Sequence, residues 1–378
     1  MPFMESVLKT AFPFIVYTVG VLIAFQMVLM IVAYTVLAER KVLGWIQGRI
    51  GPNRVGPWGL LQPFADLFKF IFKEDLTPDK STKFIYFLAP LVALTCALLP
   101  MVVYPFGPRI ADPLGWLVPY VSGTAIGDAV AWIAEQGKNM PLTLAQIDVG
   151  VLFVLGITSV GVYGIALAGW SSNSKYSLMG GLRSSAQMIS YELAMGASVL
   201  GVVMLAGTLD LNGIIFAQIR SPWYARWFII PQFIGFVVFL IAAFAETNRV
   251  PFDLPEAETE LVAGFHTEYS ALKFALFFMA EYVNMFTVSV MCTVLFLGGW
   301  YVPGLSHVFE VGSIPYAIVS HAAFIGKICA FLFFYIWVRG TLPRFRFDQL
   351  MNFGWKFLLP LALANVIVTI VVVYFLNI

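Results

Sequence analysis

The sequence has few charged residues, which make up only 11% of its 378 positions. A soluble globular domain carries about 25% charged residues, so this composition excludes a soluble domain of ordinary type. Hydrophobic residues instead make up 60% of the chain, and the mean hydropathy is +0.87. We therefore predict an all-α polytopic membrane protein, formed by a single membrane domain over residues 1–378.

Cysteine and histidine are also scarce, with three residues of each type. Cys96, Cys292 and Cys329 lie in apolar runs and form no C-x-x-C pair, which argues against a disulfide or an iron–sulfur site. The histidines are too few and too badly placed for paired haem ligation, and no phosphate-binding G-x-x-x-x-G-K-[ST] loop is present. We expect no metal and no redox cofactor on this chain. The net charge of +1 gives no sign of a nucleic-acid partner.

Eight apolar runs are long enough to span a bilayer, which takes about 20 residues per helix. They cover approximately 13–38, 84–106, 145–169, 184–206, 228–246, 270–298, 315–338 and 354–376. Eight spans place both termini on one side and the odd-numbered connections on the other. Most of the lysines and arginines lie in these odd-numbered connections. The positive-inside rule therefore places those connections in the cytoplasm, or in the mitochondrial matrix.

The first odd-numbered connection contains a turn region rich in glycine and proline, followed by an amphipathic segment that starts at Trp58. Its apolar residues share one helical face: Leu60, Leu61, Phe64, Leu67, Phe68 and Ile71. About ten residues of this kind are too short to span, and they predict a short helix that lies flat at the membrane interface. The helix either anchors the chain or roofs a cavity that opens to the lipid.

Residues 246–268 form a dense acidic stretch between two apolar runs. Arg249 stands among six carboxylates: Glu246, Asp253, Glu256, Glu258, Glu260 and Glu268. A solvated loop between two spans is one interpretation. Phe252, Leu254 and Leu261 among the acids instead favour a packed segment, in which crowding and burial raise the pKa of carboxyl groups. Such a segment can take up and release protons near neutral pH.

Two more carboxylates lie inside apolar runs, Glu192 in the fourth and Glu281 in the sixth. A carboxylate at such depth costs a few kcal/mol by insertion scales, so each is a functional hypothesis. The alternative for Glu281 is a structural ion pair with Lys327 of the seventh run. Glu192, Glu246 and Glu281 could line one polar path, although the sequence does not establish that they face one another.

Three long strings of sequence carry a family resemblance, and they cover 38–66, 169–192 and 246–282. The first reads A-E-R-K-V-L-G-W-I-Q-G-R-I-G-P-N-R-V-G-P-W-G-L-L-Q-P-F-A-D and the second G-W-S-S-N-S-K-Y-S-L-M-G-G-L-R-S-S-A-Q-M-I-S-Y-E. The third reads E-T-N-R-V-P-F-D-L-P-E-A-E-T-E-L-V-A-G-F-H-T-E-Y-S-A-L-K-F-A-L-F-F-M-A-E-Y. Together they resemble the quinone-binding membrane component of respiratory complex I, called the H subunit in bacteria and subunit 1 in mitochondria. The connection 106–145 looks longer than in the family, and its role is left open.

The resemblance implies a subunit of a proton-pumping NADH:quinone oxidoreductase that is not catalytic alone. In that family the membrane subunit and the soluble subunits docked on it form a narrow chamber for the quinone headgroup. Quinone is the substrate, while NADH, FMN and the iron–sulfur clusters belong to partner subunits. The implied partners are the soluble iron–sulfur and quinone-site subunits, adjacent small membrane subunits and the lipid bilayer. The implied location is the bacterial cytoplasmic membrane or the mitochondrial inner membrane.

The resemblance also assigns residues to two roles. The chamber and its entrance map to the end of the first span, the amphipathic helix and the acidic stretch, with Glu39, Arg40, Trp58, Phe64 and Phe252. The proton relay toward the antiporter-like subunits maps to Glu192, Glu246, Arg249, Asp253, Glu256, Glu258, Glu260 and Glu281. No catalytic residue and no metal ligand is implied for this chain.

Three other functions stay open at the level of sequence. Related membrane subunits occur in membrane-bound hydrogenases and in complexes that use other electron donors. A stand-alone ion channel or transporter would suit the intramembrane acids, but it would leave the flat helix and the glycine-rich connection without a purpose. A purely structural anchor for soluble redox subunits would tolerate neutral residues in place of the intramembrane glutamates.

Overall fold

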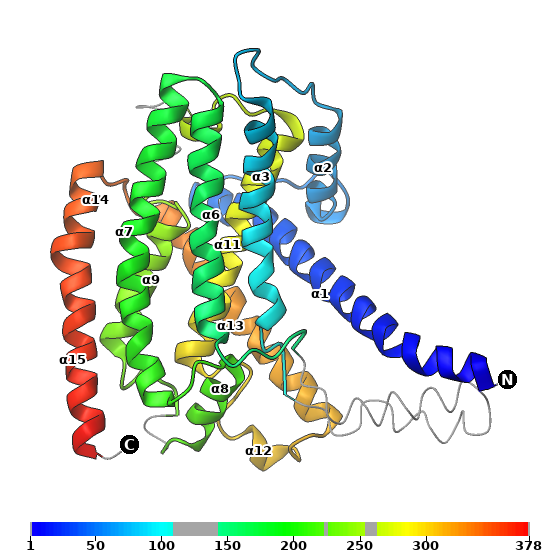
Figure 1. Ribbon diagram of the computed structural model, residues 1–378, viewed down its shortest axis with the longest axis vertical. Helices are drawn as coiled ribbons and strands as arrows, with labels where there is room; N and C mark the ends of the chain where they lie inside the picture. The colour runs from blue at the N-terminus through cyan, green and yellow to red at the C-terminus, as the bar shows by residue number, and fades with distance from the viewer. Residues whose placement is uncertain (1, 109–142, 223–225, 254–262, 377–378) are drawn as a thin grey trace.

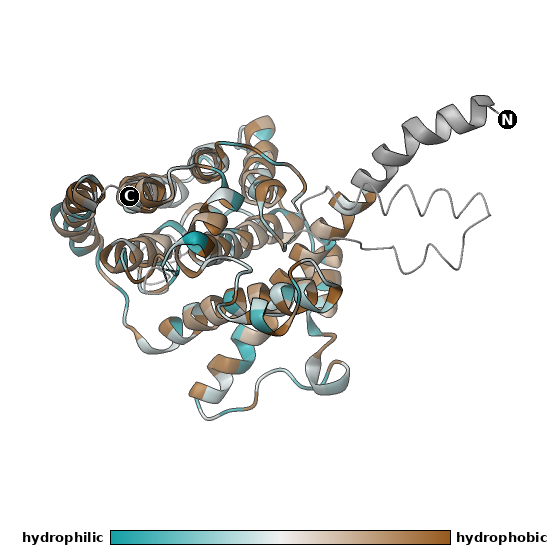
Figure 2. Ribbon diagram, turned by 90° about the horizontal axis from the view of Figure 1, so that it is seen from below, coloured by the Kyte–Doolittle hydropathy of each residue, from teal (hydrophilic) through white to brown (hydrophobic). Residues whose placement is uncertain are grey.

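The computed structural model describes residues 2–108, 143–222, 226–253 and 263–376, with side chains from Thr18 onward. These residues form helices and turns and contain no strand. Seven helical stretches are long and apolar enough to cross a membrane. Seen from below, the helices are predominantly hydrophobic (Figure 2). The predicted class, an all-α polytopic membrane protein, is confirmed.

The seven long stretches are α1 (Pro2–Ile46), α3 (Lys83–Leu98) with the turn η2 (Leu99–Val103), α6 (Gly150–Ser171), α7 (Lys175–Ala206), α11 (Ala271–Leu297), α13 (Ile314–Thr341), and α14 (Phe347–Phe353) continued through a π-helical turn (Gly354–Leu358) into α15 (Leu359–Leu376). The shorter helices are α2 (Gln62–Phe72), α8 (Leu211–Arg220), α9 (Phe233–Glu246) and α12 (Leu305–Val308). Two 3-10 turns, η1 (Pro57–Gly59) and η3 (Gly264–His266), lie in the connections.

Helices α7 and α11 form the middle of the bundle (Figure 1). The first contacts α6, α9 and α15, and the second contacts α3, α13 and α1. Helix α1 is inclined to the others, and its N-terminal end points away from the bundle (Figure 1). The connections after α1, α6 and α13 lie toward one end of the molecule, and those after α7 and α11 lie toward the other (Figure 1). This is the alternation that the apolar runs predict, while the compartment on each side stays a prediction.

The fifth apolar run contains a helix that is shorter than the seven long stretches, and together they match the expected count of about eight among the described residues. The run was placed at 228–246, but α9 has only 14 residues. At a rise of 1.5 Å per residue, α9 is about 21 Å long, less than the roughly 30 Å of a hydrocarbon core. The first residues of the run form turns instead of helix. Beyond α9 the backbone continues as a non-helical segment, 247–253, most of which is buried. Non-helical backbone at membrane depth is tolerated where it is buried in protein.

The expected amphipathic helix is present as α2, and none of its residues is buried. The apolar side chains of α2 and of the two residues before it are exposed: Leu60, Leu61, Phe64, Leu67, Phe68 and Ile71. A contiguous exposed apolar face of this kind marks a surface for lipid or for another protein. In Figure 1, however, α2 runs alongside α3 and not across it, which differs from the flat orientation predicted.

Polar contacts on both sides of α2 hold it in this orientation. Arg40 of α1 binds Asp66 of α2, with 2.6 Å between Nη1 and Oδ2. Just after α2, the Nζ of Lys273 on α11 lies 2.9 Å from Oδ1 of Asp75 and donates to the carbonyl of Leu76 at 3.0 Å. Because α1 and α11 are long helices of the bundle, they fix α2 against the side of the protein.

Glycines on α7 allow close contact with the segment that follows the acidic stretch. A Cβ atom added at Gly180 would lie 2.6 Å from the Cα of Gly264 in η3. Small residues of this kind let backbones approach closely in membrane proteins. Residues 264–266 are therefore held directly against α7.

We predict that Gly180→Ala lowers the stability of the protein, because its methyl group would overlap the backbone of Gly264. Overpacking of this kind costs about 1–3 kcal/mol. Gly196→Ala is the matched control on the same helix, since nothing lies within 4 Å of its added Cβ. The control should be neutral or more stable by up to about 1 kcal/mol. Thermal unfolding in membranes measures both, and equal midpoints would contradict the prediction.

Candidate functional site

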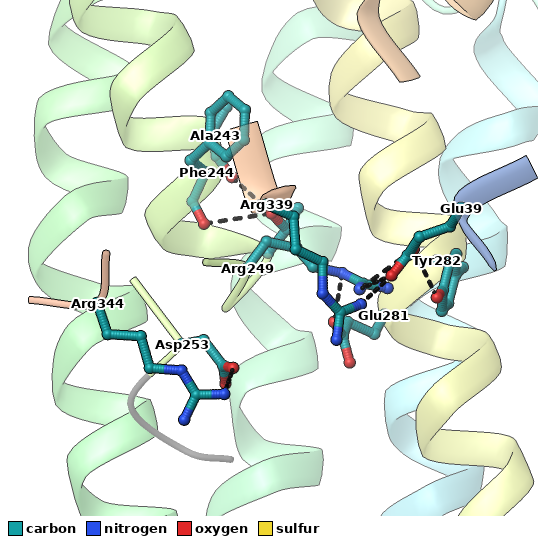
Figure 3. A network of polar contacts seen from close by, with 10 residues as sticks. Glu39, Ala243, Phe244, Arg249, Asp253, Glu281, Tyr282, Arg339 and Arg344 are labelled. Atoms are coloured by element: carbon teal, nitrogen blue, oxygen red, sulfur yellow. Dashed lines mark hydrogen bonds and ion pairs between the residues drawn. The ribbon is translucent and has the colours of Figure 1, made fainter. Parts of the chain in front are cut away.

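Three of the predicted site residues, Glu39, Arg249 and Glu281, meet where α1, α11, α13 and the segment 247–253 come together (Figure 3). Five side chains form a compact group that we call the ion cluster: Glu39 of α1, Arg249 of the segment, Glu281 and Tyr282 of α11, and Arg339 of α13. The acidic loop and the first span therefore lie side by side, although Glu39 and Arg249 are 210 positions apart in sequence.

Arg249 is the centre of the ion cluster. Its Nε lies 2.7 Å from Oε1 of Glu281, and its Nη1 lies 3.4 Å from Oε1 of Glu39. The guanidinium carbon sits 4.2 Å from the centroid of the Tyr282 ring. Burial lowers the pKa of Arg249, but Glu281, Tyr282 and Glu39 outweigh it and raise the pKa well above its usual value. Arg249 is therefore a permanent cation.

Glu39 also binds a second arginine and a tyrosine. It is 5% exposed, forms an ion pair with Arg339, and accepts a hydrogen bond from the Tyr282 hydroxyl at 2.8 Å. Two carboxylates thus face two guanidinium groups, so the cluster is balanced in charge. Removing one partner from such a group leaves an uncompensated buried charge, which is strongly destabilising.

Glu39 and Arg40 were assigned to the same chamber, but the structure separates them. Helix α1 continues to Ile46 instead of ending near residue 38, so the two side chains stand on different faces of a continuous helix. Glu39 points into the ion cluster, whereas Arg40 is exposed and binds Asp66 on α2. Arg40 therefore belongs with α2, and Glu39 with the interior.

A small cavity of about 50 Å³ lies beside the ion cluster. Its polar lining comes from Glu246, Asn248, His266, Glu281 and Asn284. Three oxygens of these residues are buried without a protein partner: Oε2 of Glu246 and the Oδ1 atoms of Asn248 and Asn284. The rest of the lining is apolar, and a cavity of this volume has room for a few water molecules beside the polar groups. It is far smaller than the roughly 300 Å³ of a typical ligand pocket.

The three acids that could line one path are neighbours in the structure. Glu246, at the end of α9, and Glu281, on α11, line the same cavity. Glu192 of α7 lies within electrostatic range of Glu246 and accepts a hydrogen bond from Ser159 of α6. The helix α7 begins earlier than the predicted run, which places Glu192 near its middle.

Glu281 does form an ion pair, but its partner is Arg249 and not Lys327, so the partner expected for that pair is wrong. The Nζ of Lys327 instead donates to the carbonyls of Leu297, Gly299 and Tyr301 at 2.7, 2.8 and 2.8 Å. These carbonyls lie at the C-terminal end of α11, where a cation is favourable beside the helix dipole. Lys327 caps a helix, and the cation that meets Glu281 is Arg249.

Asp253 and Phe252 lie apart from the ion cluster. Oδ2 of Asp253 binds Nη2 of Arg344 at 3.0 Å, and its side chain is buried (Figure 3). Phe252 is buried between Tyr191 and Phe345, with ring centroids 5.6 and 5.5 Å away. Phe252 therefore packs inside this chain, and its assignment to the quinone chamber stays a prediction.

The remaining predicted residues divide into two groups. Trp58 and Phe64 stand on or beside α2 and are 82% and 41% exposed, so both are open to an incoming apolar molecule. Glu256, Glu258 and Glu260 lie outside the described residues. Within the part of the chain that the structure describes, no three His, Cys, Asp or Glu side chains gather as metal ligands would.

Sequence reasoning missed three residues of this region. Arg339 and Arg344 follow the seventh run and look like ordinary topology charges in the sequence. Gln187 lies in the fourth run, five residues before Glu192, and its amide bonds two carbonyls of the buried loop. A polar side chain inside an apolar run was the only signal for Gln187, and it is the same kind of signal that singles out an intramembrane acid.

We predict that Arg249→Met destabilises the protein by about 3 kcal/mol, because it leaves the buried Glu39 and the half-buried Glu281 with one cation fewer. Arg40→Met is the control, since it removes an exposed ion pair worth roughly 0–1 kcal/mol. Thermal unfolding in detergent compares the two variants. A similar, small loss in both would show that the ion cluster carries no special stability.

Comparison with known proteins identifies the family. The family model described as NADH dehydrogenase matches residues 19–370. The chain is 52% identical over 357 residues to the second H subunit of NADH-quinone oxidoreductase from Koribacter versatilis, covering 94% of this chain and 96% of that protein. It is 50% identical over 355 residues to NADH-quinone oxidoreductase subunit 8 of Rhodothermus marinus, covering 92% and 94%. The chain therefore belongs to the NADH dehydrogenase family of multi-pass membrane proteins, which includes the H subunits of NADH-quinone oxidoreductase.

Proposed function

We propose that this chain is the membrane subunit of a proton-pumping NADH:quinone oxidoreductase, where it admits quinone and couples quinone reduction to proton translocation. The names of the relatives support the place in the complex. The observation that carries the coupling role is the cavity that Glu246 and Glu281 both line, which adjoins the ion cluster. That cluster in turn contains Glu39 of α1, the helix next to the proposed entrance.

The quinone side of the proposal lies at α2. Its exposed apolar face and Trp58 offer contact to an isoprenoid tail or an apolar ring arriving from the bilayer. The cavity inside this chain is too small for a headgroup, so the headgroup chamber is completed by soluble partner subunits. They dock at the end that carries the connections after α1, α6 and α13, which is the cytoplasmic side by the positive-inside rule.

Reduction of a quinone to a quinol takes up two electrons and two protons. The electrons come from a partner subunit, and the protons come from groups near the headgroup. This uptake changes the charge beside Glu39, and Glu39 shares Arg249 with Glu281. When Arg249 moves toward one carboxylate, the proton affinity of the other rises, because it loses its counter-charge.

The acids then act as a coupled set. Glu281 and Glu246 exchange protons through water in their common cavity, and the charge of Glu246 acts on Glu192. Interacting groups of this kind titrate together and not one at a time. Quinone chemistry at one end of the set thus changes proton occupancy at the other, toward the partner subunits that pump.

Glu246→Gln and Glu192→Gln should each lower quinone reduction and proton pumping together in the assembled complex. Gln cannot take up a proton, so either substitution interrupts the set of acids, and we expect a loss of about tenfold or more. NADH:quinone activity and proton uptake in vesicles measure the two outputs. Glu310→Gln is the control, because Glu310 is exposed at the opposite end. Full rates and full stoichiometry in both test variants would exclude the relay.

Phe64→Ala should raise the KM for quinone by about tenfold and leave kcat nearly unchanged, because a Phe contact contributes roughly 1.5–3 kcal/mol of apolar binding. Phe357→Ala is the control, since Phe357 is also exposed but lies on the far side of the bundle. Steady-state kinetics with a short-chain quinone give both constants. An unchanged KM, or an equal rise in the control, would remove α2 from the quinone path.

A further inference from the structure

Gln187 makes an unusual pair of contacts with the buried loop. Its Nε2 donates to the carbonyl of Ala245 at 2.8 Å and to the carbonyl of Phe252 at 2.8 Å. These two carbonyls lie on opposite sides of the turn that carries Glu246 and Arg249. One side-chain amide therefore closes the loop from end to end. The two carbonyls also fix the orientation of the amide, because a flipped oxygen would face both of them.

The contact is fully enclosed. Gln187 is 0% exposed, and its two hydrogen bonds join α7 to both ends of the non-helical segment 247–253. Buried backbone carbonyls need partners, and the residues of a non-helical turn cannot all supply them internally. Without the amide, the carbonyl of Phe252 would have to find another donor or reach water, and the carbonyl of Ala245 would keep only the longer bond from the N–H of Asn248 at 3.3 Å.

The same loop is held from its other side by the connection after α13. The N–H of Phe345 donates to the carbonyl of Pro251 at 3.0 Å, and Arg344 binds Asp253. On α7, one turn after Gln187, the hydroxyl of Tyr191 donates to the carbonyl of Leu350 at 2.9 Å. The loop is therefore fixed on two sides. Of these contacts, the bond from Gln187 to the carbonyl of Ala245 is the one next to Glu246 in sequence.

We propose that Gln187 is a positioning residue of the relay: by bonding the carbonyls of Ala245 and Phe252 it sets the place of Glu246 at the cavity and of Arg249 in the ion cluster. This inference rests on the proposed coupling role of that site. Gln187 touches neither quinone nor a moving proton. It acts through the loop, since a displacement of about 1 Å at a catalytic group can cost a factor of one hundred.

The chain contains a close match for Gln187 that serves as a control. Gln218 of α8 is also 0% exposed, and its Nε2 also donates to two backbone carbonyls, those of Val294 and Leu295 at 2.9 and 3.3 Å. Its contacts lie at the end of α11 remote from the ion cluster (Figure 1). Gln187→Met and Gln218→Met thus remove the same pair of amide-to-carbonyl bonds from equally buried sites, and only the first adjoins the acids. Gln218→Met also removes the bond that the Gln218 oxygen accepts from the N–H of Phe228 at 3.2 Å, so it is the more severe change of the two.

The test uses the assembled complex in membranes. For Gln187→Met we expect normal assembly, an unchanged rate of NADH oxidation with hexacyanoferrate, and quinone reduction and pumping lowered by about tenfold, the effect of losing roughly 1.4 kcal/mol. The pH profile of quinone reduction should also shift, because the acids sit in altered surroundings. Gln218→Met should change neither the rate nor the profile.

Gln187→Glu adds a second readout. A carboxylate facing two carbonyl oxygens repels them, whereas its protonated form can donate to one of them. We therefore expect Gln187→Glu to be more impaired than Gln187→Met at about pH 8 and to recover relative to it as the pH falls toward about 6. A merely structural role would give losses that follow the amount of assembled complex at every pH.

Measuring Glu246→Gln in the same assays separates this inference from the proposed function. If Glu246→Gln keeps full rates and stoichiometry, the relay itself is excluded. If Glu246→Gln is impaired while Gln187→Met matches Gln218→Met in rate and pH profile, only the positioning role is overturned. Equal impairment of Gln187→Met and Gln218→Met, in proportion to lost assembly, overturns it too.

Discussion

A buried arginine between two carboxylates is the constraint on which the site depends. Arg249 stands on a short non-helical segment, while its partners stand on α1 and α11. Since a buried cation needs its counter-charges, these elements must meet at one place for the chain to fold at all. Arg339 of α13 binds the same Glu39 and brings in a third helix. The ion pairs therefore hold the bundle together at the point where the acids gather.

The short helix α9 makes this arrangement possible. A full-length span would continue past Glu246 and fill the space that the loop 247–253 occupies. The loop in turn needs donors for its carbonyls, which come from Gln187 on α7 and from the backbone of Phe345. Irregular backbone inside a membrane protein survives only with such partners. Thr247 and Asn248, at the start of this loop, line the cavity that Glu246 and Glu281 share.

The two halves of the proposed function use different physical features. The relay side is buried and polar, and ion pairs within the chain hold it together. The α2 side is apolar and exposed, and none of the residues of α2 is buried. Glu39 and Arg40, consecutive on α1, connect the two sides, because one faces the ion cluster and the other binds α2. In the proposed function, a movement of α1 or α2 on quinone entry would therefore displace Glu39 and change its ion pair with Arg249.

The sequence alone determined the features that depend on local composition and period. These are the membrane class, the long spans, the amphipathic segment at α2, and the acids placed where water is scarce. Tertiary structure decided which charges pair: Glu281 with Arg249 and not with Lys327, and Glu39 with Arg339, 300 positions away. It also decided that Phe252 is buried and that Gln187 holds the loop. Hydropathy and helical period depend on residues within a few turns of one segment. The partner of a charged side chain depends instead on which distant helices come into contact.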